Sequence, residues 1–196
     1  MRTRDEQKEA LVKEKAIELL VKLGFEGFSM QKLAKAARIS PATLYIYYSD
    51  KDDLIRQLGI ELGHKMTDIT LDGFTGKMSF AEGMKKQWEN RSRYWMKYPK
   101  DALAYEVIRH SPHGPFVAQQ IGARFRPVME EFGLNAIHNN ELRPVSFEVF
   151  WSIAYGPLYT MLKFHAEGRT NHSMPFEFSD KIMYEALDLV LKALKP

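Results

Sequence analysis

Apolar residues recur along almost the whole chain at the spacing of an α-helix, and this pattern restricts the fold more than any other feature. No stretch shows the strict alternation that is typical of a half-buried β-strand. Pro and Gly residues separate the apolar stretches at short intervals, and no internal repeat or glycine-rich loop occurs. The sequence therefore predicts an all-α fold of about nine helices.

The first four predicted helices follow one another closely, and the second and third are short. The first ends at Gly24, because glycine commonly stops a helix. The second begins after Ser29, a suitable N-cap, and the third has Ser40 as its N-cap and Pro41 in its first turn. A fourth helix follows over about residues 51–67.

The later predicted helices are longer and richer in aromatic residues. We expect them over residues 79–98, 100–110, 116–132, 146–166 and 179–195. Gly156-Pro157 interrupts the hydrogen-bond ladder of one of them and predicts a kink. We expect two functional parts, residues 1–50 and residues 51–196, which the fourth helix connects.

The second and third helices are separated by residues 38–40 alone. This arrangement is typical of a helix-turn-helix, whose second helix enters the major groove of DNA. At about 100° per residue, Leu44 and Tyr48 share the side of the third helix that should face the core. The opposite, groove-facing side carries Ala42, Thr43 and Ile46. Tyr45 and Tyr47 lie on the two flanks, where their hydroxyls can reach phosphates on the groove walls.

The stretch from Ala16 through Leu54 resembles the TetR family of bacterial regulators. The resemblance rests on Ala16, Leu19-Leu20, Gly24-Phe25, Ser29, Leu33-Ala34, Ala37, Ile39-Ser40, Thr43-Leu44-Tyr45, Tyr47-Tyr48, Lys51 and Leu54. The rest of the chain is similar to the family in outline only, as a larger C-terminal helical domain for ligand binding and dimerisation. The resemblance implies a homodimer whose two third helices read a near-palindromic operator in double-stranded DNA.

The resemblance also implies which residues contact phosphates. These positions are Ser29, Thr43, Tyr45, Tyr47 and Lys51. Lys51 begins the fourth helix, where the helix N-terminus adds its own attraction for phosphate. Arg38 and Ala42 stand where glycine is frequent in the family, so we expect Arg38 to cost some backbone strain while adding a phosphate partner. We assign Ser40 and Pro41 to the same DNA-facing surface.

The groove-facing side of the third helix has no Arg, Asn or Gln, the usual bidentate readers of guanine and adenine. Ala42, Ile46 and the methyl group of Thr43 suit thymine methyl groups. We therefore expect half-sites to be read through thymine contacts and DNA shape, with Gln31 as the direct polar reader. Residues 29–51 carry a net charge of +3, equal to that of the whole chain. On charge alone, an ordinary solvated surface is the better explanation.

Aromatic residues are concentrated between residues 80 and 165. Any single one is better explained as core, but together they favour a pocket for a small apolar or aromatic effector. Trp88, Arg91 and Trp95 share one helix face, which makes Arg91 a candidate semi-buried anchor. The full set of candidate effector-binding residues is Trp88, Arg91, Trp95, Glu106, His110, Phe147, Trp151 and Tyr155.

The last two predicted helices each have an apolar face that is broader than one core needs. Pairing them across a two-fold axis would form a four-helix bundle, as the resemblance also implies. The residues expected in this dimer interface are Phe150, Ala154, Leu158, Met183, Leu187, Val190 and Leu194.

The functional hypothesis is a ligand-responsive repressor that a small effector releases from its operator. One alternative is a DNA-binding activator or architectural regulator that a protein partner controls, and a remote one is a small all-helical enzyme. No nucleophile–base pair and no metal, phosphate-binding or dinucleotide motif occurs, so we expect no catalytic residues, metal or cofactor. The lack of Cys, of an apolar leader and of a membrane-spanning run favours a cytoplasmic protein without membrane contact.

Overall fold

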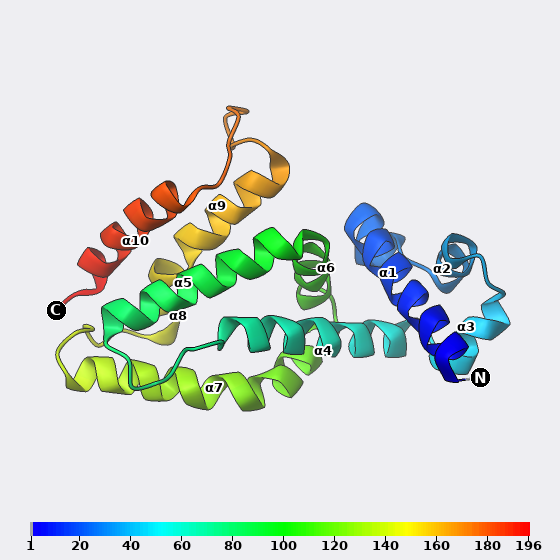
Figure 1. The fold of residues 1–196 in the computed structure, drawn as a ribbon, viewed down its shortest axis with the longest axis horizontal. Helices are drawn as coiled ribbons and strands as arrows, with labels where there is room; N and C mark the ends of the chain where they lie inside the picture. Colours follow the sequence, from blue (N-terminus) through cyan, green and yellow to red (C-terminus); the bar gives the residue numbers. More distant parts are fainter. Residues whose placement is uncertain (1) are drawn as a thin grey trace. The chain divides into compact units, whose positions relative to one another are not determined.

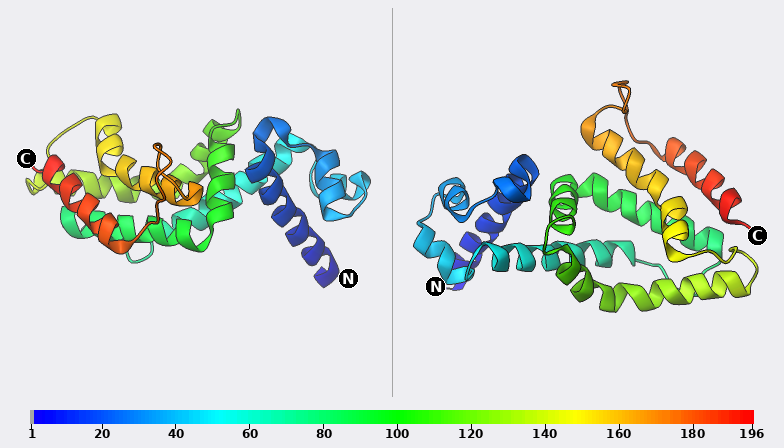
Figure 2. Two further views of the ribbon diagram at one scale, coloured as in Figure 1. Left: turned by 90° about the horizontal axis from the view of Figure 1, so that it is seen from above. Right: turned by 180° about the vertical axis from the view of Figure 1, so that it is seen from behind.

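The computed structural model describes residues 2–196, with side chains from residue 6 onward. The described residues form ten α-helices, and their only β-pairing is one isolated bridge, so the predicted all-α fold is confirmed (Figure 1 and Figure 2). The helices are α1 (Arg2–Gly27), α2 (Met30–Ala37), α3 (Pro41–Tyr47), α4 (Lys51–Thr70), α5 (Phe80–Lys97), α6 (Pro99–Arg109), α7 (Gly114–His138), α8 (Phe147–Ala154), α9 (Gly156–Glu167) and α10 (Asp180–Leu194).

The helix expected over residues 146–166 is two helices, which explains why ten are found. Tyr155 ends α8 with φ −125° and ψ −21°, outside the helical region. Pro157 then lies in the first turn of α9, where its missing N–H leaves no partner unsatisfied. Gly24 has a similar effect in α1, because its φ of 68° and ψ of 179° interrupt the helix three residues before the end at Gly27.

Packing divides the chain into two compact units. Unit 1 consists of the chain up to Met66 together with Tyr98–Ala123, and unit 2 consists of Thr67–Lys97 and Arg124–Pro196. Unit 1 thus contains the predicted DNA-binding part, and adds most of α4, all of α6 and the beginning of α7. The functional boundary at residue 50 stays a prediction.

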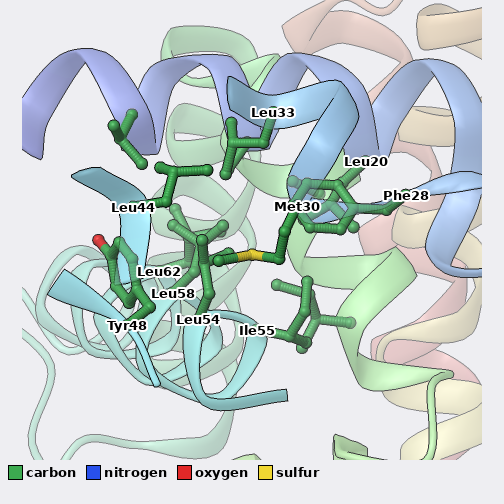
Figure 3. Close-up of a cluster of buried hydrophobic side chains, with 14 of the residues drawn as sticks. Leu20, Phe28, Met30, Leu33, Leu44, Tyr48, Leu54, Ile55, Leu58 and Leu62 are labelled. Atoms are coloured by element: carbon green, nitrogen blue, oxygen red, sulfur yellow. The ribbon is translucent and has the colours of Figure 1, made fainter. Parts of the chain in front are cut away.

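Unit 1 is organised around one apolar core to which each of the first four helices contributes (Figure 3). Leu20 of α1, Leu33 of α2, Leu44 of α3 and Leu54 of α4 are all buried, with at most 1% of their surface exposed. Burying such a side chain is favourable by about 1.5–3 kcal/mol. Because α2 and α3 are too short to be stable alone, this core is what holds them in place.

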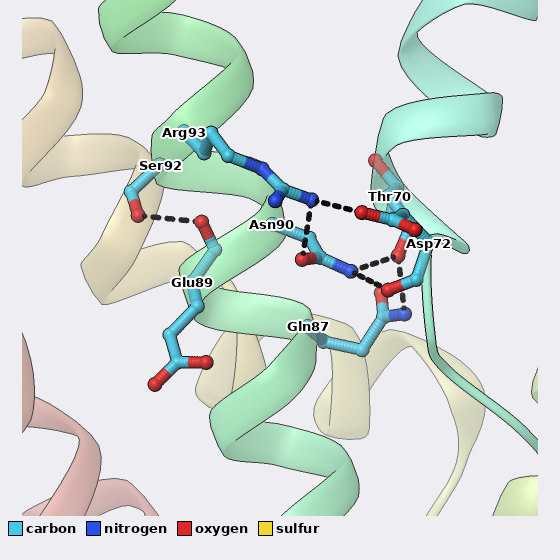
Figure 4. Close-up of polar contacts among 7 residues, drawn as sticks. All are labelled: Thr70, Asp72, Gln87, Glu89, Asn90, Ser92 and Arg93. Carbon is cyan, nitrogen blue, oxygen red and sulfur yellow. Dashed lines mark hydrogen bonds and ion pairs between the residues drawn. The ribbon is translucent and has the colours of Figure 1, made fainter.

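In unit 2, α5 packs against α9 and α10, and α8 packs against α10 (Figure 1). Polar side chains of α5 also hold the end of α4 (Figure 4). The amide nitrogens of Gln87 and Asn90 donate to the carbonyl of Thr70 at 3.0 and 2.9 Å. Since the last carbonyls of a helix lack partners within the helix, these two side chains act as a C-terminal cap for α4.

Candidate DNA-binding surface and candidate effector site

The turn between α2 and α3 depends on a left-handed backbone conformation at Arg38. This residue has φ 55° and ψ 42°. The N–H of Ile39 donates to the carbonyl of Ala34 at 3.0 Å and so closes α2. A residue with a Cβ in this conformation costs about 1–2 kcal/mol. The backbone strain expected at Arg38 is therefore present.

The N-terminus of α3 is capped as the sequence predicts. Ser40 Oγ accepts a hydrogen bond from the N–H of Thr43 at 3.1 Å and lies 2.8 Å from Thr43 Oγ1. Pro41 occupies the first turn of the helix. The cap uses the hydroxyls of Ser40 and Thr43 to order the start of α3, and both stand at the exposed or half-exposed surface.

The two sides of α3 differ as periodicity predicts. Leu44 and Tyr48 are buried, with 0% and 3% of their surface exposed. On the other side Ile46 is 78% exposed and Tyr45 is 54% exposed, and Ala42 is exposed as well. Single exposed apolar residues are common in proteins. Here, however, one seven-residue helix presents Ala42, Tyr45 and Ile46 together.

The remaining candidate DNA-binding residues differ in how exposed they are and in the contacts that they already make. Ser29 caps α2 by accepting a hydrogen bond from the N–H of Lys32 at 3.3 Å. Gln31 is exposed in the first turn of α2. Tyr47 is half-buried against the core of unit 1, so only part of its ring remains at the surface.

Lys51 has a structural role that sequence reasoning missed. Its ammonium donates to the carbonyl of Phe25 at 2.9 Å and lies 4.1 Å from the centroid of the Phe25 ring. Lys51 thus connects the start of α4 to the end of α1. The ammonium has three N–H donors, so others remain for a phosphate. A contact across 26 residues leaves no signal in local spacing.

In unit 2, Arg91 is the centre of a cluster that we call the arginine cage, which consists of Arg91, Phe125, Trp151, Tyr155 and Tyr159. Only 4% of the surface of Arg91 is exposed. Its guanidinium carbon lies 4.3 Å from the ring centroid of Tyr155. It lies 5.5 Å from the centroids of Phe125 and Trp151 and 5.9 Å from that of Tyr159.

Hydrogen bonds tie the arginine cage to the end of α4. Arg91 Nη1 donates to Tyr159 Oη at 2.6 Å, and Nη2 donates to Gln87 Oε1 at 3.1 Å. The amide nitrogen of the same Gln87 donates to Thr70 at the end of α4 (Figure 4). The side chain of Gln87 therefore connects Arg91 to the last turn of α4.

The structure brings together only some of the predicted effector-binding residues. Arg91, Trp151 and Tyr155 belong to the arginine cage, and Trp95 adjoins it through Tyr159 at a centroid distance of 6.4 Å. Trp88 is fully buried beside it, and its indole N–H donates to the carbonyl of Ala154 at 2.8 Å.

The other three predicted effector-binding residues do not belong to the cage. Phe147 is 68% exposed, although its ring is 5.9 Å from that of Trp151. Glu106 and His110 belong to unit 1, where Glu106 pairs with Arg109. Sequence reasoning also left two cage residues out of the set. The signal for Tyr159 is its place one turn after Tyr155, whereas Phe125 comes from a separate helix, α7.

Six residues predicted for the dimer interface lie in the core of unit 2. Ala154, Leu158, Met183, Leu187, Val190 and Leu194 are each at most 5% exposed. Phe150 is half-buried against the rings of Phe80 and Tyr155. Side chains that are buried within one chain have little area left for a second chain. Periodicity locates an apolar face but does not tell which neighbour covers it.

Within the described residues, no three His, Asp or Glu side chains are arranged to hold a metal ion. No helix in this part of the chain combines the length and the hydropathy that a membrane crossing requires.

Comparison with known proteins identifies the family. Residues 8–58 match the family described as bacterial regulatory proteins, tetR family. The solved structure of a TetR family transcription regulator from Marinobacter aquaeolei VT8 is 26% identical, with a TM-score of 0.84 over 100% of this chain and 99% of that one. Residues 8–58 thus match the TetR family, and the whole chain has the fold of a TetR-family regulator. The resemblance noted over residues 16–54 is thereby confirmed.

Two further relatives come from Haemophilus influenzae. A solved structure of a TetR-family transcriptional regulator is 16% identical and shares the fold with a TM-score of 0.77, over 100% of both chains. A curated protein described as an uncharacterized HTH-type transcriptional regulator is 29% identical over 72 residues, which are 37% of this chain and 38% of that protein. All these relatives are described as regulators and none as an enzyme, in agreement with the sequence-based expectation.

The strain at Arg38 predicts the relative stability of two variants. Arg38→Gly removes the Cβ that disfavours the left-handed conformation, but it adds flexibility to the unfolded chain. We expect a net stabilisation of about 0.5–1 kcal/mol, or about 1–4 °C in Tm. Arg38→Ala is the matched control, because it removes the same charge and keeps the Cβ. Thermal unfolding in which Arg38→Gly is no more stable than Arg38→Ala would contradict the strain.

Proposed function

We propose that this TetR-family protein is a ligand-responsive repressor, which binds a near-palindromic DNA operator as a homodimer and leaves it when a small apolar or aromatic effector binds. The observation that carries the proposal is the outer side of α3. Ala42, Tyr45 and Ile46 are exposed there, while Leu44 anchors the helix from behind. In a helix-turn-helix this is the side that enters the major groove.

Residues around α3 supply the polar groups that phosphate binding needs. Hydroxyl and cationic side chains occur at the ends of α2 and α3, and the N-terminus of α4 follows them in the chain. Such groups can contact phosphates on either side of a groove. The proposed phosphate-binding set is Ser29, Arg38, Ser40, Thr43, Tyr45, Tyr47 and Lys51, with Pro41 completing the surface at the first turn of α3.

The apolar outer side of α3 favours readout of thymine. A side chain that is 78% exposed, as Ile46 is, can reach the floor of the groove. Isoleucine has no hydrogen-bonding group, so its favourable contact in the major groove is the C5-methyl group of thymine. Gln31 is the proposed polar reader, because it is exposed in the first turn of α2 and can pair with adenine.

Thymine readout predicts the behaviour of an operator selected from random DNA. We expect half-sites rich in A·T, and replacing the contacted thymine by uracil should weaken wild-type binding about threefold, since one methyl contact is lost. Ile46→Ala should cause a similar loss, and uracil should then cost nothing further. Fluorescence anisotropy gives the four dissociation constants, for wild type and Ile46→Ala with the thymine-containing and the uracil-containing DNA. Half-sites dominated by G·C that Gln31→Ala leaves unaffected would contradict it.

A second copy of the chain is proposed to cover one side of α10. Ile182, Ala186, Leu189 and Ala193 follow one another at helical spacing and are half-buried or exposed, with Leu189 63% exposed. They lie next to the buried residues Met183, Leu187 and Val190, which face the core of the chain's own unit 2. The broad apolar face of α10 thus has one half for its own core and one half for a partner.

This interface predicts the oligomeric state of a charge variant. Leu189→Glu should convert the dimer to a monomer, because two like charges would meet without solvent across the two-fold axis. Leu134→Glu on α7 is the matched control, since Leu134 is 68% exposed and a charge there should leave the dimer intact. Sedimentation equilibrium checks both. A monomeric wild type, or equal effects of the two variants, would contradict the interface.

The effector is proposed to bind at the arginine cage. Three of the predicted effector-binding residues meet there, and Gln87 joins Arg91 to the end of α4. The α4 helix begins at Lys51, directly after the helix-turn-helix, and ends at Thr70. A ligand that favours one position of the last turn of α4 would therefore favour one position of the whole helix. An effector releases the operator only to the extent that it binds the released state more tightly. The alternative is that a protein partner provides the switch.

A further inference from the structure

Arg91 is a buried cation that no acidic side chain neutralises. Among the described residues, its hydrogen bonds go to two neutral oxygens, Tyr159 Oη and Gln87 Oε1. The guanidinium stays charged at any physiological pH. An uncompensated charge that is 4% exposed is costly, and proteins normally pair it with a carboxylate. The surrounding rings of the arginine cage offset only part of this cost, through cation–π attraction.

Two further polar atoms of the cage have no well-formed hydrogen bond. Arg91 Nε and Tyr155 Oη are both buried without a hydrogen bond of good geometry, although the guanidinium attracts the Tyr155 hydroxyl. The Tyr155 ring lies closest of the four to the guanidinium, at 4.3 Å. Buried polar groups are almost always well hydrogen-bonded, so two poorly satisfied donors beside one unneutralised cation point to a missing acceptor.

The chemistry of these donors indicates what the missing group is. It must accept hydrogen bonds from a guanidinium and a phenol and must carry a negative charge. A carboxylate does so, because its two oxygens match the edge formed by Nε and a neighbouring Nη of arginine. Burial raises the pKa of Tyr155 to about 12, so its hydroxyl keeps the proton that it would donate. Phe125 and Trp151 then offer apolar surface to the body of the ligand.

We propose that the effector is a small carboxylate with an apolar or aromatic body, whose carboxylate pairs with Arg91 Nε and the Tyr155 hydroxyl inside the arginine cage. This inference rests on the proposed function, that is, on an effector that acts through unit 2. It adds the charge of the ligand and the two residues that recognise this charge. A neutral or cationic ligand would leave Arg91 as unneutralised as it is without a ligand.

The test uses probes that share an apolar body and differ in one group. These are 4-phenylbutyrate, its primary amide and 4-phenylbutylamine, with octanoate and octanamide as an aliphatic pair. Titration of the full-length protein is followed by tryptophan fluorescence, since Trp151 belongs to the cage. We expect each carboxylate to bind at least about tenfold more tightly than its amide, and the amine to bind more weakly than both.

Two variants locate the site that recognises the charge. Arg91→Met should weaken carboxylate binding about tenfold or more and change amide binding less than about twofold. Its Tm without probe should be unchanged or higher, because a buried unneutralised charge has been removed. Tyr155→Phe keeps the ring and removes the hydroxyl, so it tests the site even if Arg91→Met fails to fold. We expect about a threefold to tenfold loss for the carboxylates. Tyr184→Phe on α10, outside the cage, is the control: it also removes a tyrosine hydroxyl, which donates to Glu89, and it should leave carboxylate binding unchanged.

The possible outcomes distinguish a failure of the carboxylate proposal from a failure of the proposed function. Equal or tighter binding of amide or amine, no binding of either carboxylate up to about 10 mM, or a carboxylate preference that survives both cage variants would overturn the inference. Anisotropy with the selected operator completes the test. If the wild type binds the operator and carboxylates do not change its affinity, the carboxylate proposal is wrong and the proposed DNA-binding function is retained. If the wild type does not bind any operator, the proposed function itself is wrong.

Discussion

The burial of Leu44 in the core of unit 1 is the interaction on which the proposed function depends. The α3 helix has seven residues and would not be stable alone. Leu44 inserts among side chains of α1, α2 and α4, and Ser40 caps the first turn. These two anchors orient the helix so that Tyr45 and Ile46 face outward. The same packing strains Arg38, because a tight turn between α2 and α3 needs one left-handed residue.

Local features of the fold could be predicted from the sequence because their causes are local. The N-caps Ser29 and Ser40 and the two sides of α3 follow from hydrogen-bonding capacity and from helical periodicity. The break at Gly156-Pro157 also follows from residue type, although the sequence suggested a kink and the structure has two helices. Contacts between distant residues could not be predicted in this way. Lys51 meets the carbonyl of Phe25 only because α1 and α4 share a core.

The candidate effector and dimer sites show the same limit. Periodicity placed Arg91 on the inner face of α5, and the structure buries it there. It could not tell that the surrounding rings come from α7, α8 and α9, or that Glu106 and His110 belong to the other unit. For α10 the sequence predicted a broad apolar face, and the structure buries Met183, Leu187 and Val190 of it in the chain's own core. Which half meets the chain's own core depends on how α10 packs on α5 and α8, and this is information that one helix alone does not hold.

In the proposed binding mode, two copies of α3 enter the major groove of one operator. Hydroxyl-radical footprinting of the full-length protein on the selected operator tests this binding mode. We expect two protected half-sites related by a two-fold axis, with their centres about one helical turn apart, at roughly 34–36 Å or a multiple of it. Protection of a single site, or protection that the Ile46→Ala and Gln31→Ala variants retain without any loss, would contradict the account.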